Sequence, residues 1–137
     1  MTAEALSKDS FANKILTYPD TFLHQKSEIV TLPLSNADRE LIEDMRLTMY
    51  KENGVGLAAV QIGFNKRICV IDISPSKANP IVMINPIVKS KSEETLMMNE
   101  GCLSAPGKFA DVKRHIRMKV NYWCEHEEEH EKTFYDL

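Results

Sequence analysis

Residues 124–132 read C-E-H-E-E-E-H-E-K, and within them His126 and His130 fit the pattern H-E-x-x-H. On a helix this spacing places two imidazoles on one face beside Glu127, an arrangement that binds zinc or iron and activates water. The neighbouring residues are almost all acidic, whereas a ligand helix that packs against a sheet needs apolar neighbours. The flanking segments HIRMKVNYW and TFYDL both resemble strands. We therefore predict the polar turn of a hairpin here, with a compressed metal helix as the alternative.

Two other stretches contain residues suited to chemistry, namely GVGLAAVQIG at 54–63 and EGCLSAPG at 100–107. Gln61 is a single amide in an apolar run, and its simplest interpretation is a side chain that bonds to backbone at a helix-to-strand turn. Cys102 follows a glycine and precedes a Pro-Gly pair, which predicts a thiol in a loop or at a strand end. Such a thiol is either inert or serves as a nucleophile or metal ligand. A cysteine nucleophile also needs a histidine base, and the sequence singles out none of its four histidines.

The clearest element is a helix over residues 35–52, SNADRELIEDMRLTMYKE. Ser35 and Asp38 have the spacing of a capping box at its start. Leu41, Met45 and Met49 follow at intervals of four, which gives the helix one apolar stripe that should face a core.

Strands are predicted around this helix. Residues 66–74 (KRICVIDIS) are rich in β-branched residues, and residues 81–90 (IVMINPIVKS) form a second apolar run, bent at Asn85-Pro86. Residues 115–123 alternate apolar and polar side chains, which indicates a half-buried strand, and TFYDL can pair with it as a hairpin. The fold class is therefore α+β, with mostly antiparallel strands and one long helix in the N-terminal half. We expect residues 1–137 to form a single domain.

Bulk properties exclude several classes of function. The net charge of −3 offers no basic field for nucleic acid. The apolar runs are too short to span a membrane. Three widely spaced cysteines argue against a disulfide framework and favour a reducing compartment, so we expect a cytoplasmic protein.

The two motifs taken together resemble those of the peptide deformylase family, G-x-G-L-A-A-x-Q and E-G-C-L-S. The similarity extends from about residue 13 to about residue 123. It implies removal of the N-formyl group from the formyl-methionine of new polypeptides, close to the ribosome. It also implies one divalent metal ion, Fe²⁺ in the first place and Zn²⁺ or Ni²⁺ as substitutes, with Cys102 among its ligands.

The resemblance further implies a function for individual residues of the site. The side-chain amide of Gln61 and the backbone N–H of Leu103 would stabilise the oxyanion that develops on the formyl oxygen. The substrate groove would be lined by Val55, Gly56 and Gly101. This chemistry is reasonable on physical grounds, because fixed donors aimed at a developing oxyanion are worth about 3 kcal/mol each.

The family's third motif is H-E-x-x-H on a C-terminal helix, which lies farther beyond the motif cysteine than His126 does here. We therefore expect the chain to be C-terminally incomplete, to lack that metal-ligand helix, and to have little activity by itself. The first alternative is a non-catalytic module on the same fold that binds N-terminal peptides or metal. The second is a hydrolase with Cys102 as nucleophile, and the third is loose metal uptake by the His-Glu loop.

Overall fold

The computed structural model describes residues 15–135. The predicted helix is present as α2 (Asn36–Lys51) and begins with the expected capping box. The Ser35 hydroxyl accepts from the Asp38 N–H at 3.0 Å, and the Asp38 carboxylate accepts from the Ser35 N–H at 3.3 Å. Met45 and Met49 are fully buried, which confirms the apolar stripe. Within residues 15–135 no helix, α2 included, has the length and apolarity needed to cross a membrane.

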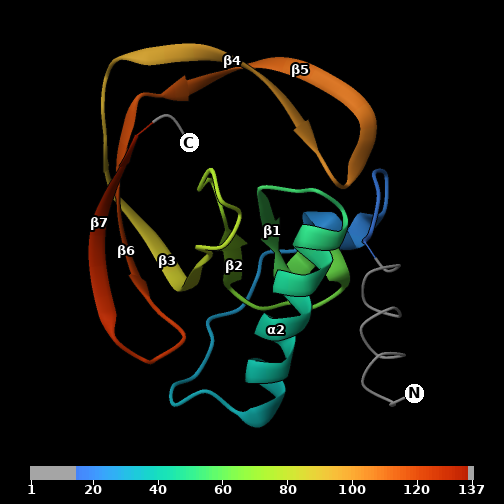
Figure 1. The fold of residues 1–137 in the computed structure, drawn as a ribbon, viewed down its shortest axis with the longest axis vertical. Coiled ribbons are helices and arrows are strands. Elements are labelled where there is room, and N and C mark those ends of the chain that lie inside the picture. The colour runs from blue at the N-terminus through green and yellow to red at the C-terminus, as the bar shows by residue number, and fades with distance from the viewer. Residues whose placement is uncertain (1–14, 136–137) are drawn as a thin grey trace.

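The main sheet has five strands in the spatial order β1-β2-β3-β6-β7, and every pair is antiparallel (Figure 1). The strands are β1 (Gly56–Ala58), β2 (Ile68–Ile71), β3 (Ile81–Lys91), β6 (Arg117–Trp123) and β7 (Glu129–Tyr135). Helix α2 packs against β1 and β2. The predicted α+β class is confirmed, as are the strands expected near residues 66–74, 81–90 and 115–123.

A second, two-stranded sheet was not predicted. It is the hairpin β4 (Thr95–Cys102) and β5 (Ala105–His115), which arches over the top of the view in Figure 1 and brings its tight end back beside β1. The Pro-Gly pair of EGCLSAPG lies inside β5, and the tight turn is at residues 103–104. The Pro-Gly pair therefore does not form the turn, whereas the predicted strand-end position of the thiol is correct, because Cys102 is the last residue of β4.

The buried side chains form two clusters. The larger one lies between α2 and the β1–β2–β3 part of the sheet, and its fully buried members include Met45, Val70 and Ile84. The smaller cluster lies along β6 and β7, where Val120 and Tyr122 are buried between exposed or half-buried neighbours. This alternation is the period of two that the sequence predicts for residues 115–123.

The residues that fit H-E-x-x-H form a hairpin turn and the start of a strand. β6 ends at Trp123 and β7 begins at Glu129, so His126 lies in the turn and His130 in the strand. Glu127 occupies the left-handed region with φ of 63° and its N–H donates to the Cys124 carbonyl at 2.9 Å. The predicted hairpin is confirmed and the compressed metal helix is wrong. The partner strand begins before TFYDL, and the last two residues of TFYDL lie outside the described residues.

The bend predicted in β3 occurs at Asn85, which has φ of 53°. The register with β6 shifts between Ile84 and Ile87. The Asn85 side chain accepts from the Val30 N–H at 2.8 Å and donates to the Val30 carbonyl at 2.9 Å. The Asn85 side-chain amide therefore bonds to the Val30 backbone in the place of a neighbouring strand, and it holds the segment before α2 on the sheet.

The segment before α2 contains the short 3-10 helix η1 (Thr21–His24). Near its start it touches both motif stretches. The Leu16 N–H donates to the Gln61 carbonyl and the Tyr18 N–H to the Ser104 carbonyl, each at 2.7 Å. Residues far apart in the sequence are thereby held together around the site described below.

Asp72, just after β2, is a buried carboxylate with several donors. It accepts from the hydroxyls of Ser74 and Tyr50 and from the N–H groups of Ser74 and Asn79. The Ser74 and Tyr50 hydrogen bonds lower the pKa of Asp72 to about 2. Burial, together with the neighbouring Asp72 charge, raises the pKa of Tyr50 to about 12. This network joins the end of α2 to the loop after β2.

Candidate active site

Gln61 lies on a second short 3-10 helix, η2 (Ala59–Ile62), which ends at Gly63 with φ of 87°. Its Oε1 accepts from the Ala58 N–H at 2.9 Å, so the two ends of the amide are distinguished by a backbone donor. Its Nε2 therefore faces the other motif, donating to Ser104 Oγ at 3.1 Å and to Cys102 Sγ at 3.6 Å. One end of the Gln61 amide therefore bonds to backbone, as predicted, and the other end presents a donor beside Cys102.

Cys102 is exposed, whereas Ser104, two residues later, is buried. The pairing of β4 with β5 shifts register between Gly101 and Cys102, so that Cys102 opposes Ala105 across the tight turn. A bulge of this kind redirects a side chain at the end of a hairpin. The thiol is thereby directed toward Gln61 and remains accessible from outside.

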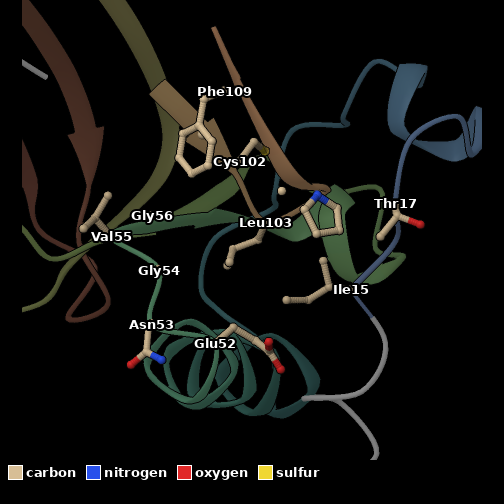
Figure 2. A pocket seen from close by; sticks show the side chains of 13 residues that line it. Ile15, Thr17, Glu52, Asn53, Gly54, Val55, Gly56, Cys102, Leu103 and Phe109 are labelled. Atoms are coloured by element: carbon tan, nitrogen blue, oxygen red, sulfur yellow. The ribbon is translucent and has the colours of Figure 1, made fainter. Parts of the chain in front are cut away.

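A cavity of about 910 Å³ opens in front of this thiol. Figure 2 shows Cys102 and Phe109 on one side of it and the end of α2, with Glu52 and Asn53, on the other. The lining residues are Ile15, Thr17, Glu52, Asn53, Gly54, Val55, Gly56, Gly101, Cys102, Leu103, Pro106, Gly107 and Phe109. Five of the six predicted site residues belong to this set, and Gln61 joins the site through its contact with Cys102.

Two glycines of the motifs are explained by close approach of other side chains. A Cβ on Gly54 would lie 2.7 Å from Leu103 Cδ1, and a Cβ on Gly101 would lie 2.7 Å from Phe109 Cε1. At Gly56 a Cβ would meet only a backbone oxygen at 3.7 Å, which is ordinary contact. Gly56 instead belongs to β1, an edge strand, so one side of its backbone remains available beside the cavity.

Three residues of the site were not predicted from the sequence, namely Phe109, Ile15 and Ser104. Phe109 is an exposed aromatic residue in the middle of β5, and recognising that strand would have placed it opposite Gly101. Ser104 belongs to the quoted E-G-C-L-S stretch and could have been inferred from its position beside the cysteine. Ile15 has no signal in the sequence, because only the fold brings the N-terminal segment to the cavity.

Glu100, the first residue of EGCLSAPG, forms an ion pair with Arg114 of the neighbouring strand β5. Its carboxylate accepts two hydrogen bonds from Arg114, from Nε at 2.8 Å and from Nη2 at 2.7 Å. The Arg114 hydrogen bonds lower the pKa of Glu100. This bidentate pair joins β4 to β5 one residue before the bulge, so it helps to fix the hairpin that presents Cys102.

The residues around Cys102 match only part of a metal site. The thiol is an acceptable ligand for Fe²⁺, Zn²⁺ or Ni²⁺. Among residues 15–135, however, the one group of three His, Cys, Asp or Glu side chains close enough to share an ion lies elsewhere and excludes Cys102. The cavity lining also contains no histidine within the described chain, which leaves a cysteine nucleophile without the base it needs. One ligand alone does not hold a catalytic metal, so these residues do not fit the complete group.

Comparison with known proteins places this geometry in a family. The chain is 44% identical over 115 residues to the peptide deformylase of Rickettsia akari, covering 79% of this chain and 65% of that protein. It is 46% identical over 106 residues to the peptide deformylase of Zymomonas mobilis, covering 73% and 59%. The chain therefore spans less than two thirds of the length of these curated relatives.

Similar solved structures are also peptide deformylases. A peptide deformylase from Legionella pneumophila superposes with a TM-score of 0.85 at 38% identity, covering 90% of this chain and 72% of that one. A probable peptide deformylase from Synechococcus phage S-SSM7 gives 0.84 at 35% identity, covering 90% and 84%. The family model described as polypeptide deformylase matches residues 12–137. The chain belongs to the polypeptide deformylase family.

Proposed function

We propose that this chain acts in removing the N-formyl group from formyl-methionyl peptides. The proposal rests on one observation above all, the Gln61 amide held 3.6 Å from the Cys102 thiol at the edge of a large cavity. Hydrolysis of a formamide needs a hydrogen-bond donor at its oxygen and an activated water at its carbon. The Gln61 amide is suited to the first task, and the Cys102 thiol is suited to ligating a metal ion that activates water. We also propose that residues 1–137 belong to a single deformylase-like domain.

In this proposal the formyl oxygen is held by the Gln61 Nε2 and by the backbone N–H of Leu103. Gln61 is suited to the task because Ala58 fixes the direction of its amide and because the amide does not titrate. The peptide backbone lies along the free edge of β1 at Gly56 and beside Val55, the residue before that strand. The absence of a side chain at Gly101 leaves room for the Phe109 ring, which supplies an apolar wall for the methionine side chain.

The family's divalent ion, Fe²⁺ in the first place and Zn²⁺ or Ni²⁺ as substitutes, would polarise the formyl group and activate water. Cys102 is the one ligand that we assign to it. Because the other ligands are not found among the described residues around Cys102, we expect the chain alone to have little hydrolytic activity. The residues assigned here bind and orient the formyl group.

The proposed partners are N-formyl-methionyl nascent peptides at the ribosome, in the cytoplasm. The first test is binding of formyl-Met-Ala and of Met-Ala to the full chain, followed by NMR. The formylated peptide should bind more tightly and shift the signals of Gln61 and Leu103, and Gln61→Glu should abolish the preference. Equal affinity for the two peptides in the parent chain would overturn the assignment of the formyl subsite.

A second candidate is a non-catalytic module that recognises N-terminal peptides. It is favoured by the single metal ligand found beside the cavity. Anaerobic Fe²⁺ and a synthetic H-E-x-x-H helix, copied from the C-terminal part of a relative, separate the two candidates through an assay of formate release. Formate release that is lost in Cys102→Ser supports the enzyme. Peptide binding that ignores chelators, with no formate released, supports the module.

A further inference from the structure

A second cluster of metal-ligating side chains lies on the β6–β7 hairpin, away from the cavity. Cys124 follows β6, Glu128 precedes β7 and His130 lies in β7. The ligand atoms of these three side chains all lie within 4.8 Å of one another. Within residues 15–135 this is the one such group, and it contains neither His126 nor Cys102.

The strand register explains why these residues meet. Tyr122 pairs with His130, and the Cys124 N–H donates to the Glu128 carbonyl at 2.9 Å. Side chains two residues apart on a strand share one face. Cys124 therefore lies beside Tyr122, and Glu128 beside His130, on the same face of the hairpin. The His130 ring also stacks on Tyr122, with centroids 5.5 Å apart and an interplanar angle of 22°.

The turn that joins these residues is held in place by two arginines of α2. Glu125 accepts from Arg46 of α2 at 2.8 Å, and Glu127 accepts from Arg39 of α2 at 2.7 Å. The Arg46 hydrogen bond lowers the pKa of Glu125. These pairs fasten the turn to α2, so a ligand would meet an ordered backbone and would not have to order a loose loop.

Of the four glutamates at 125 and 127–129, one side chain is uncommitted. Glu125 and Glu127 are engaged by arginines, and Glu129 accepts from the Asn121 amide at 3.2 Å. In the part of the chain that the structure describes, the Glu128 carboxylate makes no hydrogen bond or ion pair. It is exposed, as is His130, while Cys124 is half-buried at the edge of the smaller core cluster.

We propose that Cys124, Glu128 and His130 form a zinc site. A thiolate, an imidazole and a carboxylate are all ligands that Zn²⁺ accepts, and three protein ligands leave a fourth position for water. Zinc–ligand bonds of about 2.0–2.3 Å in a tetrahedron require ligand atoms about 3.3–3.8 Å apart. Two exposed side chains can close the remaining distance by rotation about their own bonds. The site is independent of the deformylase proposal.

The test uses the full chain, reduced and metal-free, titrated with Co²⁺ as a spectroscopic substitute for Zn²⁺. We expect saturation at one equivalent, with a thiolate-to-cobalt charge-transfer band that Zn²⁺ removes. Cys124→Ser should abolish the band, and His130→Gln should weaken binding by about tenfold or more. Glu128→Gln, at an exposed position, should weaken binding without affecting the fold.

Matched controls distinguish this site from two other places where a metal ion could bind, at His126 and at Cys102. His126→Gln, in the same acidic turn, and Cys102→Ser, at the cavity, should both leave the band and its midpoint unchanged. Circular dichroism of every variant excludes unfolding as the cause of a loss. The proposal is overturned if no saturable binding occurs, or if the band depends on His126 or Cys102 and survives Cys124→Ser.

Discussion

Replacement of Gln61 by alanine is expected to destabilise the fold, although Gln61 belongs to the candidate active site. The side chain satisfies the half-buried Ala58 N–H and donates to the hydroxyl of buried Ser104. Truncation leaves both groups without these partners. An unsatisfied buried polar group costs about 1–3 kcal/mol, and the Ala58 N–H can recover part of its share from water, so we expect a total loss of about 2 kcal/mol.

Gln61→Glu provides the matched comparison. Its carboxylate still accepts from the Ala58 N–H, and the Ser104 hydroxyl can reverse its direction and donate. We therefore expect the Glu variant to remain within about 1 kcal/mol of the parent. Gln25→Ala, an exposed glutamine on the N-terminal segment, controls for the loss of an amide as such and should change stability by less than about 0.5 kcal/mol.

The assay is urea unfolding at pH 7 followed by circular dichroism. With a slope of about 2 kcal/mol per molar urea, a loss of 2 kcal/mol lowers the midpoint by about 1 M. A Gln61→Ala variant as stable as the parent would refute the reasoning, because it would show that the two hydrogen bonds do not contribute. An equal loss in Gln61→Glu would refute the assignment of Ala58 as the principal anchor.

Four further predictions concern the core, the buried Asp72 carboxylate, the Tyr50 hydroxyl and the cavity. Met45→Ala removes a fully buried side chain and should cost about 2–5 kcal/mol in the same urea assay. The lowered pKa of Asp72 contributes stability that is fully present above its unfolded value of about 4 and is lost as the pH falls toward 2. The urea midpoint should therefore drop over that range in the parent and less steeply in Asp72→Asn. The raised pKa of Tyr50 acts in the opposite sense, so alkaline unfolding should be shallower between pH 10 and 12 in Tyr50→Phe. Gly101→Ala should displace the exposed Phe109 ring with little loss of stability, and should change the NMR shifts of that ring and weaken formyl-peptide binding.

Much of the fold could be predicted because the relevant interactions are local. The capping box at Ser35, the stripe through Met45 and the alternation in residues 115–123 each follow from side-chain period and backbone hydrogen bonding. The turn at His126 was predictable from acidic composition, because charged side chains do not pack against a sheet. These features need no knowledge of distant parts of the chain.

The β4–β5 hairpin was missed for a physical reason. Its strands are largely exposed and contain polar or charged residues on both faces, so no alternation of apolar side chains identifies them. As long as that hairpin is not recognised, Pro106 resembles a turn residue and nothing in the sequence assigns Phe109 to the site. The pairing of Glu100 with Arg114 is visible only once the register of the two strands is known.

The sequence by itself determined the helix, the central strands and, through two short motifs, the residues Gln61 and Cys102 that define the family. Only the tertiary structure decided that these two side chains lie 3.6 Å apart and that Phe109 and Ile15 enclose the cavity before them. It also decided that His130 joins Cys124 and Glu128 and does not pair with His126. For the side chains on the two hairpins the physical reason is strand register, because a pairing shifted by one residue would turn Cys102, Phe109 and His130 to the opposite face. Gln61 and Ile15 reach the site because the fold packs their segments against the β4–β5 turn.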